Sequence, residues 1–267
     1  HSRFNCADEQ VEYRGRTLKL PGEDHRFDRD ELTVAEIIAH SSNRGAARLG
    51  MLLGEDRLYR YARAFGFGDK LGFPVGGEVA GILERPEKWN PIDITRIPMG
   101  HTVAVTALQM HQAMSAIASG GVLLRPQIVQ EVRDASGETI FLRKDGIPLG
   151  RVISVSTAQT MAAMLMGVAS KQGTAPEAAI DGFDVAGKTG TTQMLIEGKY
   201  DSRHHVATFV GFFPATSPQV AISVFVHDAD ARAPGGVAYG RTVAAPSFKR
   251  IGEQLIPILD IKPNHST

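Results

Sequence analysis

This sequence of 267 residues has a single cysteine, no long apolar run and a net charge of zero. The single cysteine, Cys6, has no second cysteine to pair with, which excludes an internal disulfide framework. We expect Cys6 to be a small, partly buried side chain. No run approaches the roughly 18 apolar residues of a membrane-spanning helix. The longest, Val220–Val226, is interrupted by one serine and has the length of a strand.

The charges balance, with 29 Lys and Arg against 29 Asp and Glu. A neutral chain has no broad basic surface for a nucleic acid or for an anionic membrane, so we expect neither as a partner. The nine histidines include His204-His205 and a pair of acidic residues after His227. Neither group has the ligand spacing of a zinc site, and we expect no metal and no cofactor.

The amino-acid composition is typical of a soluble globular protein: 43% of the residues are hydrophobic and 22% are charged. Thr33 and Glu36 form a capping box, which predicts a helix that ends near His40. A second capping box, Ser156 to Gln159, predicts another. Apolar periodicity and closing glycines predict the full set of helices at 33–40, 44–53, 56–65, 106–119 and 156–169, with short strands at 122–132 and 138–142.

The last hundred residues change to a strand pattern. Strands are expected at 183–193, 205–213 and 219–227, with a polar connection over 194–204 and a final helix over 243–259. Helices followed by an antiparallel sheet and a closing helix define an α+β fold. We expect a single domain, 1–267, made of an extended arm (1–31), a mainly helical part (32–170) and the sheet with its closing helix (171–267).

The segment Gly182–Thr189 matches the P-loop pattern G-x-x-x-x-G-K-[ST] letter for letter. A P-loop needs a buried strand before its first glycine and a helix that starts at the Lys-Thr pair. Thr174–Asp181 is not strand-like, and Gly190-Thr191-Thr192 are poor helix formers. A nucleotide-binding protein is therefore the weaker interpretation of this motif, and magnesium-dependent ATP binding would be its test.

The other interpretation makes Lys188-Thr189-Gly190-Thr191 part of an edge strand. A glycine in a strand permits close approach of a second backbone. The hydroxyls and the Lys188 ammonium would line one groove, which could bind a peptide as an added strand and hold its terminal carboxylate. Ser41-Ser42-Asn43 lies far upstream, where a helix is expected to end. Alone, it is more typical of helix capping than of a catalytic site.

Taken together, Ser41-Ser42-Asn43 and Lys188-Thr189-Gly190-Thr191 are similar to two motifs of penicillin-binding proteins. The order and spacing of further segments strengthen the likeness. These are Phe65-Gly66-Phe67-Gly68, Gly77-Glu78 with Gly81, Val105–Gln109, Gly120-Gly121 with Arg125-Pro126, Phe209–Ala215 and Val243–Lys249. The chain therefore resembles the transpeptidase domain of class B penicillin-binding proteins. This resemblance implies an antiparallel sheet flanked by helices.

The family's acylated serine belongs to an S-x-x-K tetrad upstream of the S-x-N triplet, and no serine here has a lysine three residues later. The resemblance implies that the chain is the C-terminal part of the domain, without the nucleophile helix and the first sheet strands. We expect an N-terminal membrane anchor outside this chain and a location on the periplasmic face of a bacterial inner membrane. An exposed sheet edge would favour self-association.

The resemblance also implies roles for individual residues. Ser41 would relay a proton toward the leaving group, assisted by Lys188, and Asn43 would bond the substrate's amide carbonyl. Thr189 and Thr191 would bind the terminal carboxylate, with Gly190 and Thr192 beside them, and the Thr191 N–H would form half of an oxyanion hole.

The implied activity is a D-alanyl-D-alanine transpeptidase that crosslinks peptidoglycan stem peptides through a serine acyl-enzyme. β-Lactams would inhibit the full-length enzyme, and division or elongation proteins would be its partners. We expect the chain alone to be inactive. The alternative of the same fold is a non-catalytic scaffold or β-lactam sensor, which predicts that the region upstream also lacks S-x-x-K.

Overall fold

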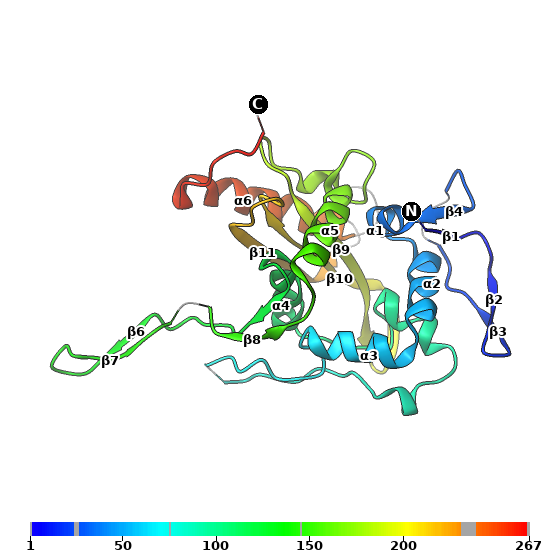
Figure 1. Ribbon diagram of the computed structural model, residues 1–267, viewed down its shortest axis with the longest axis horizontal. Helices are drawn as coiled ribbons and strands as arrows, with labels where there is room; N and C mark the ends of the chain where they lie inside the picture. Colours follow the sequence, from blue (N-terminus) through cyan, green and yellow to red (C-terminus); the bar gives the residue numbers. More distant parts are fainter. Residues whose placement is uncertain (1, 24–26, 75, 145, 231–238, 266–267) are drawn as a thin grey trace.

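A three-stranded antiparallel sheet in the order β11-β10-β9 forms the centre of the molecule (Figure 1). The computed structural model describes residues 2–23, 27–74, 76–144, 146–230 and 239–265. The sheet strands are β9 (Ala186–Ile196), β10 (Lys199–Phe213) and β11 (Val220–Asp230). Shorter strands are β1 (Arg3–Asn5), β2 (Gln10–Tyr13), β3 (Arg16–Lys19), β4 (Glu31–Thr33), β5 (Val122–Leu124), β6 (Glu131–Arg133), β7 (Thr139–Leu142) and β8 (Pro148–Arg151).

Helices cover both faces of the sheet. They are α1 (Val34–His40), α2 (Asn43–Leu53), α3 (Glu55–Ala64), α4 (Ala107–Ala118), α5 (Val155–Met166) and α6 (Ala245–Leu259). Val210 and Phe212 of β10 point to the face covered by α4 and α5, where they pack against Met114 and Leu165. The strand is apolar on both sides because it is central and buried on both faces.

The opposite face packs against α6 through an aromatic cluster. The rings of Phe209 and Phe248 are 4.8 Å apart at a tilt of 64°, and those of Phe183 and Phe213 are 5.7 Å apart at 75°. Phe209, Phe213 and Phe248 have no exposed surface. Aromatic pairs at these separations contribute beyond the apolar area that they bury, so this cluster fixes α6 on the sheet.

Gln109 joins three segments of the loop-rich part of the chain. It is fully buried at the start of α4, and its side-chain nitrogen donates to the carbonyl oxygens of Gly66, Asp69 and Ala80 at 3.2, 2.8 and 2.8 Å. Its Oε1 accepts from the backbone N–H of Thr106, which closes a capping box. The glycine-rich segments between 66 and 81 are thereby fixed to α4.

The expected elements agree with the structure where a local signal marks them. The capping box at Thr33 and Glu36 opens α1, Gly54 ends α2, and Gly66 follows α3 with a φ of +93°. The predicted order of helices, antiparallel sheet and closing helix is confirmed. Cys6 is 3% exposed, as a buried cysteine should be.

Three expectations were wrong. The α5 cap is Ser154 rather than Ser156: its side chain accepts from the Thr157 N–H and the helix starts at Val155. The polar connection 194–204 is not a loop, because β9 and β10 continue through it to a tight turn at Glu197-Gly198. The single strand expected over 122–132 is two separate strands, β5 and β6.

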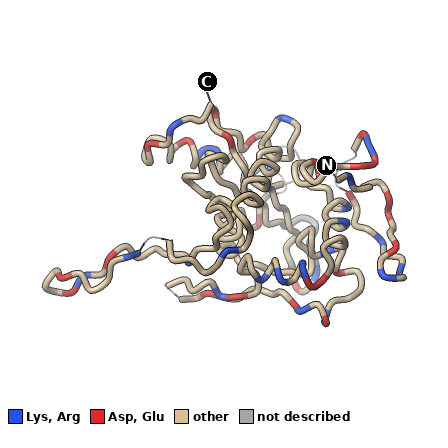
Figure 2. The backbone as a smooth tube through the Cα atoms, in the orientation of Figure 1, with Lys and Arg blue, Asp and Glu red and all other residues tan. Residues whose placement is uncertain are grey.

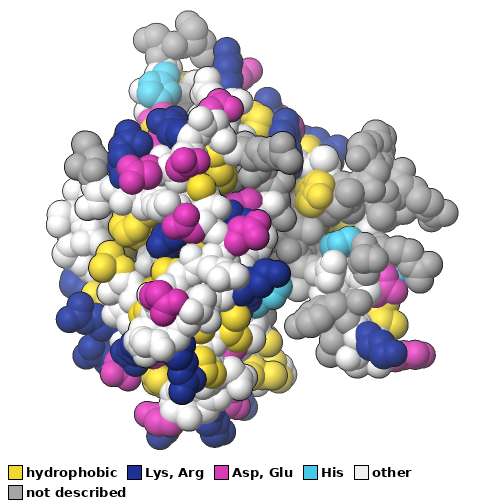
Figure 3. Space-filling model, turned by 90° about the vertical axis from the view of Figure 1, so that its right-hand side faces the viewer, with side chains coloured by type: hydrophobic (Ala, Val, Ile, Leu, Met, Phe, Trp, Pro, Cys, Tyr) yellow, Lys and Arg dark blue, Asp and Glu magenta, His cyan; other side chains and the backbone are white. Residues whose placement is uncertain are grey.

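The arm and a second hairpin extend from this body. Residues 1–31 were expected to be extended, and they contain the β2–β3 hairpin and β1, which pairs with β4. The β6–β7 hairpin projects furthest (Figure 1). On the side that carries the arm, charged and apolar side chains are interspersed (Figure 3). Along the backbone, basic and acidic residues are also interspersed (Figure 2).

None of the helices in the described part of the chain is long and apolar enough to cross a membrane. Among the same residues, no group of three His, Cys, Asp or Glu side chains is placed to hold a metal ion.

Candidate active site

The Lys-Thr-Gly-Thr segment lies in β9, whose only partner among the described strands is β10. Gly187, just before Lys188, is required by the neighbouring strand: a Cβ there would come within 2.5 Å of the Phe209 ring. A Cβ on Gly190 would come within 2.6 Å of the Thr208 hydroxyl. We expected Gly190 to make room for a substrate backbone, and the structure adds that β10 itself needs this glycine.

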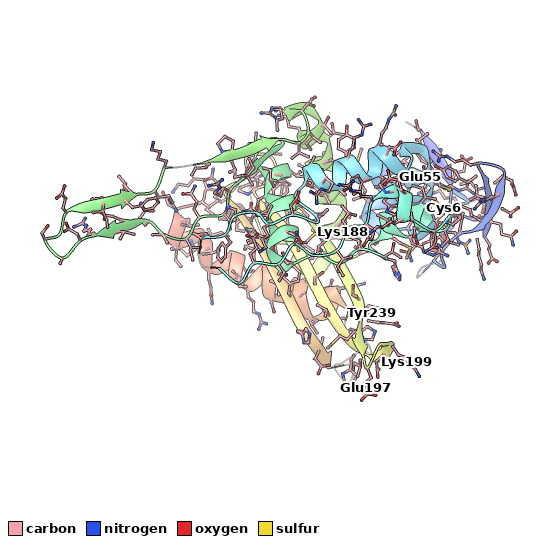
Figure 4. All side chains as sticks on the ribbon, turned by 90° about the horizontal axis from the view of Figure 1, so that it is seen from below. Cys6, Glu55, Lys188, Glu197, Lys199 and Tyr239 are labelled. Atoms are coloured by element: carbon pink, nitrogen blue, oxygen red, sulfur yellow. The ribbon has the colours of Figure 1, made fainter. Side chains whose placement is uncertain are left out.

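Lys188 lies where β9 meets the helical part of the chain (Figure 4). Its Nζ donates to Ser41 Oγ at 2.7 Å and to the Thr189 carbonyl oxygen at 3.2 Å. The two residues are 147 positions apart in the sequence. Burial lowers the pKa of the Lys188 amine from 10.5 to about 8, because a desolvated ammonium is disfavoured. At neutral pH the amine is therefore mostly charged, but it loses its proton far more readily than an exposed lysine.

Ser41 ends α1 in the left-handed conformation, with φ 58° and ψ 43°. For a residue with a side chain this conformation costs on the order of 1 kcal/mol or more. Its N–H donates to the carbonyl oxygens of Ile37 and Ile38, so the end of α1 fixes the turn. Ser42 then caps α2, since its Oγ accepts from the Gly45 N–H at 3.0 Å. The helix-capping interpretation of this triplet is confirmed for Ser42, and Ser41 is the serine that contacts Lys188.

Thr189 and Thr191 lie on the face of β9 opposite to Lys188. The Thr189 and Thr174 hydroxyls are 3.4 Å apart, and the Thr191 hydroxyl accepts from the Gly240 N–H at 3.2 Å. Thr191 and Thr192 are exposed, whereas Thr189 is partly buried. Two hydroxyls in a row on one face of a strand are suited to a carboxylate, which accepts hydrogen bonds from both.

Asn43 opens α2 and is tied to the arm. Its side-chain Nδ2 donates to the Gly22 carbonyl oxygen at 2.9 Å. Because a carbonyl oxygen can only accept, this bond fixes which end of the amide faces the arm. The structure therefore brings Ser41 and Lys188 into direct contact, and it places Asn43 two residues further along the same turn.

Three residues at this site carried no signal in the sequence. Glu23 accepts hydrogen bonds from the first turn of α2, Thr174 contacts Thr189, and Gly240 contacts Thr191. Each is distant in sequence from its partner and belongs to no recognisable motif. A Cβ on Gly240 would come within 2.3 Å of the Thr208 carbonyl oxygen, so only glycine fits this close approach.

The P-loop interpretation fails on the structure. Lys188 and Thr189 lie inside β9, paired with Val210 and Phe209 of β10. A P-loop would place them at the N-terminus of a helix, where backbone N–H groups face the phosphates.

Residues 5–253 match the family model described as the penicillin-binding protein transpeptidase domain. The chain belongs to this family, and its relatives place it among the class B penicillin-binding proteins.

Among the relatives, the stage V sporulation protein D of Bacillus subtilis is 35% identical over 231 residues, which cover 86% of this chain and 35% of that protein. The probable peptidoglycan D,D-transpeptidase PenA of Neisseria gonorrhoeae is 33% identical over 87% of this chain and 37% of its own length. This chain thus spans about a third of the length of these curated relatives.

Solved structures agree with the fold. The transpeptidase domain of Burkholderia pseudomallei penicillin-binding protein 3 superposes with a TM-score of 0.83 at 28% identity, covering 99% of this chain and 74% of that one. Penicillin-binding protein 3 of Mycobacterium tuberculosis, solved in complex with ampicillin, gives 0.83 at 28% identity over 97% of this chain and 57% of that one. The expected fold is confirmed.

Proposed function

We propose that this chain is the substrate-holding part of a peptidoglycan D,D-transpeptidase that acts through a serine acyl-enzyme. The observation that carries the proposal is the 2.7 Å contact between Lys188 Nζ and Ser41 Oγ at the edge strand of the sheet. A lysine with a pKa of about 8 next to a hydroxyl can pass a proton in either direction near neutral pH.

The proposed roles are those that the family resemblance implies. The Ser41 hydroxyl, bonded to Lys188, relays a proton to the leaving amine, and the Asn43 amide bonds the carbonyl of the bound peptide. The Thr189 and Thr191 hydroxyls bind the terminal carboxylate, with Gly190 and Thr192 beside it on β9. The Thr191 N–H faces the developing oxyanion and lowers the energy of the tetrahedral intermediate.

The substrate class is a stem peptide that ends in D-alanyl-D-alanine, and β-lactams are its inhibitory mimics. Peptidoglycan is assembled outside the cytoplasmic membrane, so the chain would act on that side. No serine in this sequence is followed by a lysine three positions later. For this chain we therefore predict peptide and β-lactam binding without acylation.

Two measurements on the same sample test this proposal. Calorimetry should show weak binding of an acetylated peptide that ends in D-alanyl-D-alanine, and weaker binding of its C-terminal amide, because the amide lacks the carboxylate for Thr189 and Thr191. Intact-mass spectrometry after incubation with ampicillin should show the unmodified mass. Equal affinity for acid and amide would contradict the carboxylate site, and one adduct mass would contradict the absence of a nucleophile.

We also propose that the outer edge of β11 can pair with another strand. In the part of the chain that the structure describes, β11 has one partner, β10. Unpaired N–H and C=O groups along an edge bind other strands, including those of a second copy. A concentration-dependent shift to a dimer in size-exclusion chromatography is expected, and a monomer at all concentrations would contradict it.

A further inference from the structure

The carboxylate of Glu23 is bound to the first turn of α2. Its Oε1 accepts from the Ser42 hydroxyl at 2.6 Å and from the Arg44 N–H at 2.8 Å. Its Oε2 accepts from the Asn43 N–H at 3.0 Å. A single carboxylate thus holds three consecutive residues, and the middle one is the asparagine of the S-x-N triplet.

This arrangement is favourable for a physical reason. The first N–H groups of a helix have no partner within it, and they form the positive end of the helix dipole. A carboxylate placed there satisfies two of them and gains from the dipole, with bonds stronger than those between neutral groups. Ser42 is 1% exposed, so little water is present to replace these bonds.

The residues before Glu23 bind the same turn. The Gly22 carbonyl oxygen accepts from the Asn43 side chain at 2.9 Å, and the Pro21 carbonyl oxygen accepts from Arg44 Nε at 3.1 Å. Both the backbone and the side chain of Asn43 are therefore bonded to the arm. The arm determines which way the Asn43 amide points.

This segment, the first turn of α2, determines the position of Ser41. Ser41 immediately precedes the capped residues, and its hydroxyl accepts the Lys188 hydrogen bond. The helices on either side leave little space for compensating movement, since a Cβ on Gly45 would come within 2.5 Å of the Ile37 side chain. A shift of the first turn of α2 would be transmitted to the Ser41–Lys188 pair.

We propose that Glu23 is a positioning residue of this site: its carboxylate fixes the Ser41–Asn43 turn against Lys188. The catalytic meaning of this positioning rests on the proposed function. The geometry itself does not, because the contacts of Glu23 exist without a ligand. Glu23 acts through Asn43 and Ser41 and has no contact with a reacting atom.

The test compares Glu23→Gln with a matched control, Glu12→Gln, in the whole chain by NMR. Glutamine has nearly the size of glutamate, but its amide nitrogen cannot accept a hydrogen bond, and the negative charge is lost. Glu12 lies in the same arm, on β2, where its exposed carboxylate contacts Thr17 and not the site.

We expect amide hydrogen exchange at Asn43 and Arg44 to accelerate about tenfold or more in Glu23→Gln, the range for losing a charge-assisted bond. Exchange in β2 and β3 should not change. The titration midpoint of the Lys188 side chain should move toward that of an exposed lysine, because a looser turn admits water. Glu12→Gln should alter neither reading.

Unchanged exchange at Asn43 and Arg44, or an unchanged Lys188 midpoint, would overturn the proposal. Acceleration spread over the whole arm with Lys188 unaffected would also overturn it, since that pattern indicates only a tether for the arm. If Glu23→Gln fails to fold, amide exchange in the wild-type chain still tests the proposal. Asn43 and Arg44 must then exchange more slowly than the first-turn amides of α3, whose N-cap, Gly54, makes no side-chain bond.

These readings are independent of the substrate. Failure of the wild-type chain to bind a D-alanyl-D-alanine peptide would contradict the proposed function and leave the Glu23 result intact. A normal Glu23 effect on Lys188 without peptide binding would therefore separate the two proposals.

Discussion

The buried amine of Lys188 predicts a pH dependence of stability that can be isolated from all other groups. The perturbation is Lys188→Met, which keeps the length of the side chain and removes its charge. In the folded chain the Lys188 pKa is about 8, against 10.5 for an exposed lysine. Between these values the unfolded chain holds more protons than the folded chain, so stability rises with pH in this window.

The magnitude follows from the two pKa values. Below pH 8 both states are protonated, and desolvation of the ammonium lowers the free energy of unfolding by about 3 kcal/mol. Most of this cost is relieved as the amine deprotonates. Between pH 7 and pH 10 the wild type should gain about 2.5 kcal/mol relative to Lys188→Met.

The assay is urea unfolding of both proteins at several values across that range. Taking the difference between wild type and Lys188→Met cancels the titration of tyrosines, other lysines and Cys6, which both proteins share. A flat difference curve would show that Lys188 is not desolvated. A difference that falls with rising pH would show a raised pKa, and either result would contradict a lowered Lys188 pKa.

Three further predictions concern the core and its ionisable groups. Phe209→Ala should lower the free energy of unfolding by about 3–5 kcal/mol in urea titrations, since it empties a fully buried aromatic site; a loss below 1 kcal/mol would contradict the packing. Gly187→Ala should lower the free energy of unfolding by about 1–3 kcal/mol, because the new Cβ meets the Phe209 ring. Gly150→Ala should be near neutral, because no heavy atom lies within 4 Å of the added Cβ. Burial lowers the pKa of His111, so the unfolded chain binds the proton first and stability should fall as pH drops below about 6.5. His111→Gln should weaken this acid sensitivity and His101→Gln, at an exposed site, should not; equal slopes would contradict it.

The elements that the sequence predicts well carry their own signals. Thr33 and Glu36 satisfy each other locally, and Gly54 and Gly66 end helices because their backbone conformations favour glycine. The turn at Glu197-Gly198 was missed because the residues on either side show no apolar alternation: Met194–Ile196 are all apolar, and 199–204 are mostly polar. Those strand ends are stabilised by cross-strand pairing, which is not visible along the chain.

The site was predictable only in part. Ser41 and Lys188 were paired through a family resemblance, because nothing in the local sequence of either residue indicates the other. Glu23 lies in a charged stretch that resembles any solvated segment, and only folding places its carboxylate at the start of α2. Tertiary contacts of this kind have no periodicity and no motif, so sequence patterns could not reveal them.

The central claim is that the Lys188–Thr192 edge of β9 holds a peptide that ends in D-alanyl-D-alanine. The most direct test is an NMR titration of the labelled chain with that peptide and with its L-alanyl-L-alanine isomer. We expect saturable shifts at Lys188–Thr192 and at Ser41–Asn43 for the D,D peptide, and much smaller shifts for the L,L isomer. Equal responses to both isomers, or shifts confined to other surfaces, would contradict it.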